Sequence, residues 1–478
     1  MPLKTPAEYK QSLRDGRAVY YRGERVRDVT SHPAIGVAVE HAAIEYALAA
    51  DPAHRELAVV EGERGAFSRY YQLPRTADDL RQRSQLVAAS TRAAGTLVLL
   101  VKEIGTDALF ALHLAAEAMA GRKWPQYRER VRAYHERCRD GDLAVAVAQT
   151  DAKGDRALGP AAQAHPDYYV RIVDERSDGI VVRGAKLHTS AITNTNEVIV
   201  LPTRALGAAD RAYAVAFALP VDTKGLTVIT SPFGGAKKDA FEHPISARHK
   251  LTEALAVFDD VFVPKERVFL QGEVEYAGPL ALGFVVYHRF TAVSYKLPLL
   301  ELLVGAARAI AEYNGVDGAG HVREKLTRLA TYHSTVAALI AQAAAACTIE
   351  PPGLAVPNAL LTNIAKYVYA SQYHAAVQMV QDIAGALLVT APGVEDVRSE
   401  AIGPLVDKYL GGKAGVPTEH RLRMLNLISD ITASDYGGYQ EVLAVHAEGS
   451  LEAEKLQTYR EYDFAGPVAY AKRLAGIG

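Results

Sequence analysis

The sequence predicts an α+β protein built from a helical part, a β-rich part and a second helical part. Up to about residue 141, apolar residues recur at helical spacing. From 142 to 272, short runs rich in Val, Ile, Tyr and Phe are separated by turn residues. From 273 to the end, long amphipathic helices return. We therefore expect three domains, over 1–141, 142–272 and 273–478.

The first part carries start and stop signals of helices. Thr5 followed by Pro6 is typical of an N-cap and a first helical position, and the helix that they open is expected to end at Gly16. Alanine- and leucine-rich segments at 32–51 and 76–121 continue the helical spacing. Between the first two helices, the run VYYRGERVRDV alternates like a small β-hairpin.

The middle part has the pattern of antiparallel strands. Two alternating runs flank Ser177-Asp178-Gly179, which is a strong signal for a hairpin turn. Several such short strands in succession predict a β-barrel or a sandwich. In the last part, a long helix runs toward Pro351-Pro352-Gly353 and at least two more helices follow. Their apolar faces either close the core of one subunit or join several subunits, and composition leaves both open.

Composition excludes several classes of function. The 478 residues include 53 basic and 55 acidic side chains, a net charge of −2 with no basic run, so we expect no nucleic-acid partner. Only two cysteines occur, Cys138 and Cys347, which favours a reducing compartment and is too few for a cysteine-built metal site. The N-terminus lacks an apolar signal segment, and the apolar runs fall short of the roughly 18 residues of a membrane span. We expect a cytoplasmic enzyme that does not bind membranes.

One loop is a candidate ligand site. Residues 149–156 read QTDAKGDR directly after an apolar strand, and such a loop offers hydroxyl, carboxylate and backbone N–H groups to a flat, polar-edged ligand. The alternative is a solvated turn. Neither a GxGxxG motif after a strand nor a GxxxxGK[ST] motif is present, so a nucleotide cofactor would have to be held in another way.

Longer strings carry a resemblance to a known family. They are AEYKQSLRDGRAVYYRGERV, TDAKGDRALGPAAQAHPDYYVRIV, DGIVVRGAKLHTSAITNTNEVIVLPT, FDDVFVPKERVFL, YHR and QDIAGALLVTAP. With these strings the chain resembles the flavin-dependent family that joins 4-hydroxyphenylacetate 3-monooxygenases with 4-hydroxybutyryl-CoA dehydratases. The resemblance implies an acyl-CoA dehydrogenase-like fold, with an N-terminal helical domain, a central antiparallel β-barrel and a C-terminal four-helix bundle. It also implies a homotetramer that binds FAD non-covalently between the β-domain and the bundle.

The resemblance implies the residues that bind FAD. They are Gln149, Thr150, Asp151, Arg156, His188, Thr189, Ser190, Gln381, Asp382 and Gly385. The first group and the KLHTS segment would lie beside the flavin ring, and the VQDIAGAL segment would contact the FAD of an adjacent subunit. Hydroxyls and backbone amides suit the polar edge of the flavin. Arg156 is expected to pair either with an FAD phosphate or with Asp151.

The ligands of the dehydratases' [4Fe–4S] cluster are mostly replaced. Where that branch has a pair of cysteines this chain has Leu99 and Glu103, and where it has the third cysteine stands Tyr295. The histidine is kept as His288. Because such clusters need thiolates, we expect no iron–sulfur cluster and no metal site. A carboxylate at position 103 would need a buried partner, for which Lys296 and Arg289 are the candidates.

The acid–base residues of the dehydratases are also changed. Their tyrosine is Ala292 here, their lysine is kept as Lys296, and Glu441 is the nearest counterpart of their C-terminal glutamate, at a different spacing. Tyr295 either replaces a cysteine as a substrate-binding or acid residue, or fills the volume that the cluster leaves.

The resemblance implies three alternative functions. The first is a monooxygenase that receives reduced FAD from a separate reductase and hydroxylates an aromatic or similar planar molecule. His288, Arg289, Tyr295 and Lys296 would then supply the base and the recognition of an anion. The second is a cluster-free flavin-dependent acyl-CoA or acid dehydratase, isomerase or desaturase. The sequence as a whole resembles this dehydratase branch more closely. The third is a non-catalytic flavin or acyl-CoA binding protein.

Overall fold

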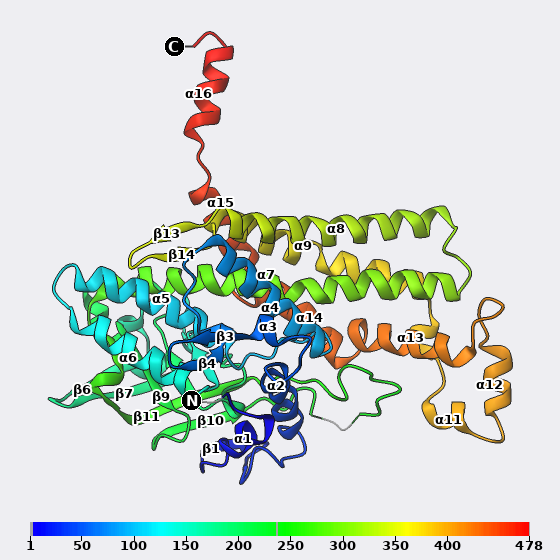
Figure 1. Ribbon diagram of the computed structural model, residues 1–478, viewed down its shortest axis with the longest axis horizontal. Helices are drawn as coiled ribbons and strands as arrows, with labels where there is room; N and C mark the ends of the chain where they lie inside the picture. The colour runs from blue at the N-terminus through cyan, green and yellow to red at the C-terminus, as the bar shows by residue number, and fades with distance from the viewer. Residues whose placement is uncertain (1–2, 236–237, 478) are drawn as a thin grey trace.

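The computed structural model describes residues 3–235 and 238–477 and has the expected order of helical, β-rich and helical parts (Figure 1). The helices before the β-rich part are α1 (Pro6–Gln11), α2 (Gly36–Leu48), α3 (Arg55–Ala58), α4 (Ala77–Ala93), α5 (Glu103–Ala120) and α6 (Gln126–Asp140). Thr5 caps α1, and its side chain accepts a hydrogen bond from the Glu8 amide, as its place before Pro6 predicts.

The segment 76–121, predicted to be helical, forms two helices. α4 ends at Ala93, and α5 begins at Glu103. Gly95 and Thr96 between them have positive φ angles of 63° and 69°, a conformation that helices do not contain. The break sends residues 97–101 into the interior, where they line the region between the β-domain and α7 (Val274–Tyr313).

The strands form two larger sheets and two hairpins. Their bounds are β1 (Ala18–Tyr21), β2 (Glu24–Arg25), β3 (Val59–Gly62), β4 (Gly65–Ser68), β5 (Val145–Ala148), β6 (Arg171–Glu175), β7 (Gly179–Lys186), β8 (Glu197–Val200), β9 (Val215–Pro220), β10 (Leu226–Thr230), β11 (Ala254–Pro264), β12 (Val268–Gln271), β13 (Thr348–Glu350) and β14 (Leu354–Val356). One sheet has the order β2-β1-β10-β11-β7-β6, and the other has the order β12-β9-β8-β5.

The expected antiparallel barrel is wrong in two respects. Among the described residues the two sheets do not close into a barrel. Two pairs, β1 with β10 and β5 with β8, are parallel. The N-terminal hairpin VYYRGERVRDV is confirmed as β1–β2, but β1 extends the central sheet rather than standing alone. Alternation of apolar residues does not report which distant strands pair, so it could not distinguish two sheets from a closed barrel. The β6–β7 hairpin is confirmed.

The C-terminal part is a bundle of long helices with shorter ones at its far end. Their bounds are α7 (Val274–Tyr313), α8 (Gly320–Ala345), α9 (Ala359–Ala384), α10 (Leu387–Thr390), α11 (Val394–Arg398), α12 (Gly403–Tyr409), α13 (Thr418–Thr432), α14 (Asp435–His446), α15 (Leu451–Glu461) and α16 (Ala465–Leu474). α7, α8 and α9 pack against one another, and α13 packs on α7 and α9 (Figure 1). Within the described ranges α7 alone is long and apolar enough to cross a membrane, but 67% of its apolar window is buried inside the molecule.

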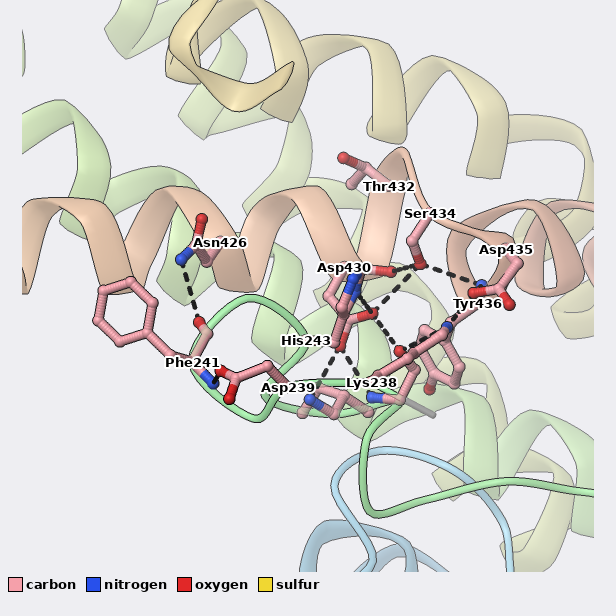
Figure 2. A network of polar contacts seen from close by, with 12 residues as sticks. Lys238, Asp239, Phe241, His243, Asn426, Asp430, Thr432, Ser434, Asp435 and Tyr436 are labelled. Carbon is pink, nitrogen blue, oxygen red and sulfur yellow. Dashed lines mark hydrogen bonds and ion pairs between the residues drawn. The ribbon is translucent and has the colours of Figure 1, made fainter. Parts of the chain in front are cut away.

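A long loop joins the β-domain to the bundle. The β10–β11 loop, residues 231–253, reaches α13 and is anchored there by Asp430, as Figure 2 shows. The Asp430 carboxylate accepts hydrogen bonds from the amides of Ile245 and Ser246, at 2.9 and 2.8 Å. The loop places Glu253, at its end, beside the segment that follows β7.

Candidate functional site

The two polar segments that the sequence singles out lie side by side. The amide of Leu187 donates a hydrogen bond to the carbonyl of Thr150 (2.7 Å), and Asp151 and Lys186 form an antiparallel bridge. The segments 149–151 and 186–190 therefore form one continuous surface at the edge of the β-domain. A ligand that contacts both segments needs them to lie side by side in this way.

Asp151 and Lys186 hold this surface together from inside. The Lys186 ammonium lies 2.8 Å from the Asp151 carboxylate, and both side chains are almost fully buried. Asp151 also accepts a hydrogen bond from the amide of Val170 and one from the Thr203 hydroxyl. Burial lowers the pKa of Lys186, while Asp151 opposes that shift. The partner of Asp151 is thus the buried Lys186 rather than the exposed Arg156.

Four neighbouring side chains are available to a ligand. Gln149 and Thr150 are partly exposed and His188 is exposed, with a positive φ of 53°. The hydroxyl of Thr189 is buried without a hydrogen-bond partner among the described residues. A buried hydroxyl with no partner costs free energy unless a bound group supplies one, so Thr189 marks a point where a polar ligand edge fits.

Glu253 connects this surface to the helical bundle. Its carboxylate accepts hydrogen bonds from the Ser190 hydroxyl (2.7 Å) and from the Tyr439 hydroxyl of α14 (2.6 Å). Burial raises the pKa of Glu253, and these two hydrogen bonds oppose the rise. Ser190 is therefore held in place by a carboxylate that also fixes α14.

Beyond α14 the site contains a buried charge cluster centred on Glu448. The hydroxyl of Tyr295 and the ammonium of Lys296 both donate to the Glu448 carboxylate. A second ammonium, that of Lys366, lies 3.8 Å from it. Arg289 donates to the Glu448 carbonyl oxygen (2.9 Å). Two of the four predicted catalytic residues, Tyr295 and Lys296, thus meet at this carboxylate, and a third, Arg289, binds the backbone of the same residue. Glu448 lies between α7, α9 and the end of α14.

The charges around Glu448 keep it ionised. Burial raises the pKa of Glu448, but Lys296 and Lys366 outweigh that effect and bring it to about 2. Burial lowers the pKa of Lys296 to about 8 even though Glu448 opposes the shift. Burial, and then Glu448, raise the pKa of the Tyr295 hydroxyl well above its usual value. The cluster therefore combines a carboxylate, an ammonium and a neutral phenol, which together can accept and donate protons at neutral pH.

His288 lies on the same helix, α7, directly before Arg289 and about two turns before Tyr295 and Lys296. Its ring stacks on Phe284 with centroids 5.0 Å apart, and its Nδ1 atom lies 3.8 Å from the Asp107 carboxylate of α5. Glu448 is within electrostatic reach of His288, since the imidazole contributes to the low pKa of Glu448. All four predicted catalytic residues are therefore grouped in one region of the fold.

None of the three positions to which the resemblance assigns cluster cysteines carries a thiol. Leu99 is fully buried and offers no donor atom. The Glu103 carboxylate accepts hydrogen bonds from the amides of Val101 and Lys102, both 3.1 Å, so neither Lys296 nor Arg289 is its partner. Burial raises the pKa of Glu103. Tyr295 packs beside Leu100 in the same small apolar cluster.

The third predicted group lies at the far end of α9. The Gln381 side chain donates to the Thr432 carbonyl (2.9 Å), Asp382 pairs with Lys325 (2.6 Å), and Gly385 ends the helix with φ 79°. Within one chain, no hydrogen bond or ion pair among the described residues links this group to the 149–151 and 186–190 surface. The sequence expects it to serve an adjacent subunit, which this arrangement allows.

Sequence reasoning missed Glu448, Glu253 and Lys366. The sequence points instead to Glu441, whose side chain is partly buried on α14. The sequence offers only the pair Glu448-Gly449 just after a helical pattern as a signal. The positive φ of Glu448, 59°, which is uncommon for a residue other than glycine, is visible only in the structure.

These features define the class of protein. An N-terminal helical part, a central β-domain and a C-terminal helical bundle form the acyl-CoA dehydrogenase-like architecture, and the structure of a glutaryl-CoA dehydrogenase shares this fold with a TM-score of 0.50 at 14% identity. More narrowly, the chain belongs to the 4-hydroxyphenylacetate 3-hydroxylase family. The model of the family's N-terminal region matches residues 5–270, and that of its C-terminal region matches residues 277–476.

Two characterised relatives lie on different branches of this family. The chain is 32% identical to the 4-hydroxybutyryl-CoA dehydratase/vinylacetyl-CoA-Δ-isomerase of Clostridium aminobutyricum, over 99% of this chain and 100% of that protein. It is 33% identical to the oxygenase component of 4-hydroxyphenylacetate 3-monooxygenase of Thermus thermophilus, over 92% of this chain and 90% of that protein. Both relatives are enzymes, and this protein is an enzyme.

Solved structures from both branches match nearly the whole chain. A 4-hydroxybutyryl-CoA dehydratase from N. maritimus has a TM-score of 0.93 at 30% identity and covers 100% of this chain and 96% of that one. An oxygenase component of 4-hydroxyphenylacetate 3-monooxygenase in complex with FAD has a TM-score of 0.90 at 30% identity, covering 99% and 98%. Overall similarity thus leaves the branch open, and the residues of the site have to decide it.

Proposed function

We propose that this enzyme is a FAD-utilising oxidoreductase that acts as a reduced-flavin-dependent monooxygenase on an aromatic or similarly planar small molecule. A separate reductase would supply the reduced flavin, and the enzyme would work in the cytoplasm as a homotetramer. FAD-bound relatives at 30% identity support the cofactor, and the oxygenase relatives support the reaction class.

The residues of the 149–151 and 186–190 surface fit FAD. Thr189 has a buried hydroxyl that needs a partner, and Gln149, Thr150 and His188 are accessible beside it. Asp151, bound to Lys186, would support the loop rather than touch the ligand. Bound FAD would supply two-electron redox chemistry and, when reduced, the activation of dioxygen.

One observation carries the choice of a flavin-only site. At the three positions where the dehydratase branch has cysteines stand Leu99, Glu103 and Tyr295. Oε2 of Glu103 and the hydroxyl of Tyr295 already bond protein groups. Hydrocarbon, carboxylate and phenol do not replace the thiolates that an iron–sulfur cluster needs. The donor set does not fit a cluster, so we assign the redox chemistry to flavin alone.

The buried charge cluster would bind the substrate oxygen once its proton has left. A hydroxylation of a phenol is aided by removal of the phenol proton. The ionised Glu448 carboxylate would hold the Tyr295 hydroxyl and the Lys296 ammonium in place for this role. Lys296 and Arg289 would hold the resulting anion, because both are cationic and buried beside Glu448. Burial removes competing water and strengthens these contacts.

The test is an oxygen-isotope experiment with a panel of phenols. Enzyme, FAD, NADH and a flavin reductase are incubated under ¹⁸O₂, and products are analysed by mass spectrometry. One labelled oxygen atom in a new hydroxyl group supports the proposal. The proposal is rejected if the reduced flavin consumes the oxygen but no phenol yields a labelled product, and if the enzyme turns over another substrate class without oxygen.

A second candidate is a redox-neutral isomerase or dehydratase of an acyl-CoA. It is favoured by full-length similarity to the Clostridium aminobutyricum enzyme and by the Lys296–Glu448 pair, which provides an acid and a base without oxygen. Anaerobic incubation with vinylacetyl-CoA or 4-hydroxybutyryl-CoA tests it. Conversion without oxygen or reductase would replace the monooxygenase proposal by this one.

A further inference from the structure

We infer that Asp107 is the positioning residue of His288, and that the two side chains form a proton-transfer dyad in which the second ring nitrogen of His288 faces the substrate. The inference rests on the proposed function, because it assigns a proton acceptor to that same site. It adds a residue of α5, a helix on which sequence reasoning placed no catalytic side chain.

Asp107 is held rigidly at one of its two oxygens. The Arg83 guanidinium donates to Oδ1 at 2.7 Å, and the Thr291 hydroxyl donates to the same atom at 2.9 Å. Arg83 is itself fixed by the Glu103 carbonyl and by the ring of Phe110 beneath it. The Asp107 side chain is completely buried. Its orientation is therefore set by groups from three helices, α4, α5 and α7.

The other oxygen of Asp107 faces His288. Oδ2 is buried without a hydrogen-bond partner among the described residues, and the same is true of His288 Nδ1. These two atoms lie 3.8 Å apart. Buried polar atoms without partners are costly, and a shift of about 1 Å would join them in a hydrogen bond. Catalytic hydrogen bonds are often long before the ligand binds and shorten afterwards.

The ring of His288 is restrained so that its other nitrogen is available. Phe284 stacks on the ring with the planes only 13° apart, which limits its rotation. Nε2 makes no hydrogen bond to the described part of the chain, and it is not among the buried polar atoms that lack a partner. The His288 side chain keeps 14% of its surface exposed. If Nδ1–H points to Asp107, Nε2 carries the lone pair and can accept a proton.

The proton balance of the step is simple. A substrate O–H bond breaks, its electron pair stays on the substrate oxygen, and a new N–H bond forms at Nε2. The imidazolium that forms has the Asp107 carboxylate, of opposite charge, 3.8 Å from its Nδ1 atom. After turnover the proton returns to solvent from Nε2. Arg83 balances the charge of Asp107, so the site does not carry an isolated buried carboxylate.

The first readout needs no turnover. Diethyl pyrocarbonate modifies a histidine at a ring nitrogen that carries a lone pair, and peptide mass spectrometry measures its rate at His288 alone. We expect Asp107→Asn to slow this modification at least about fivefold, because an amide favours the tautomer with the proton on Nε2. The matched control is Glu117→Gln, which removes another carboxylate of α5, paired with Arg128, and should leave the rate unchanged.

The second readout is kinetic. Asp107→Asn should lower kcat by about ten- to a hundredfold with KM within about twofold, since it changes the proton acceptor and not the binding surface. Thr291→Val, which loosens Asp107 but keeps its charge, should act in the same direction to a smaller extent and decides the matter if Asp107→Asn does not fold. Unchanged modification of His288 in the folded variants overturns the inference. If no substrate turns over at all, the proposed function fails while the modification result still stands.

Discussion

At the level of single residues, the buried hydroxyl of Thr189 gives the most direct probe of cofactor binding. Thr189→Val replaces it by a methyl group of similar shape. FAD affinity should fall about tenfold, because the flavin edge loses one hydrogen bond. The apoprotein should melt at the same or a higher temperature, since a buried hydroxyl without a partner is removed. Fluorescence titration with FAD measures the first and a thermal scan the second. Equal FAD affinity in both proteins would take Thr189 out of the flavin site.

Lys296 predicts the alkaline limb of the pH–rate profile. Burial lowers its pKa to about 8, and the proposed role requires the charged form. The kcat/KM of the enzyme should therefore fall as pH rises through about 8. Lys296→Arg keeps a positive charge at all accessible pH values, so its profile, even with a lower maximum, should stay flat there. An alkaline limb that survives in Lys296→Arg would assign it to another group.

The residue scale also shows what sequence can and cannot supply. His288, Arg289, Tyr295 and Lys296 are close in sequence on one helix, so a family resemblance could propose them together. Glu448 lies more than 150 positions away and becomes their partner only because α14 ends beside α7. Asp107 was not foreseen for the same reason.

At the level of elements, the β10–β11 loop is fastened to α13 by one carboxylate. Asp430 is completely buried and bonds two amides and the Ser246 hydroxyl, with His243 Nδ1 3.4 Å away (Figure 2). Asp430→Ala leaves these donors without a partner, and should cost about 3 kcal/mol of unfolding free energy. Urea unfolding and limited proteolysis within 231–253 measure the effect. Glu419→Ala, an exposed change on the same helix, is the control; equal stability of the two variants would contradict the anchoring role.

A pair of histidines between α5 and α6 predicts acid sensitivity. His135 donates from Nε2 to the Tyr71 carbonyl, so its Nδ1 accepts from His113 Nε2 at 2.9 Å. Burial lowers the pKa of His113 to about 3 and that of His135 to about 4. The unfolded chain takes up protons below pH 6.5 and the folded chain does not, so stability is lost as pH falls below 6.5.

The variant His113→Leu removes one of these groups. The loss of unfolding free energy between pH 6.5 and 5 should shrink by at most about 2 kcal/mol relative to the parent protein. Denaturant titrations at the two pH values give the difference. His420→Leu, at an exposed position, should behave like the parent. An identical pH response in His113→Leu would show that His113 is protonated in the folded state.

Element boundaries and strand pairing were only partly predictable. Helical spacing identifies the segments around α4, α5 and α7, because burial of one face imposes that spacing. It did not foresee the break at Gly95 and Thr96, which lies inside an unbroken apolar pattern. It also could not foresee that β1 pairs with β10 across more than 200 residues, since pairing of distant strands leaves no local signal.

At the level of the whole molecule, the site is divided between parts of the chain that meet only in the fold. The 149–151 and 186–190 surface comes from the β-domain. The buried charge cluster around Glu448 comes from α7, α9 and the segment after α14. The Gln381–Gly385 segment lies at the other end of the bundle, beside Thr432. In the proposed homotetramer this segment would complete the FAD site of a neighbouring subunit, which would give all three groups a role.

The central claim is that flavin is the only redox group that this site accommodates. The most direct measurement is the cofactor content of protein purified and analysed without oxygen. We predict about one FAD per chain after reconstitution and no stoichiometric iron or acid-labile sulfide, because Leu99, Glu103 and Tyr295 replace the thiolates. About four iron and four sulfide per chain, or a protein that takes up no FAD, would contradict the claim.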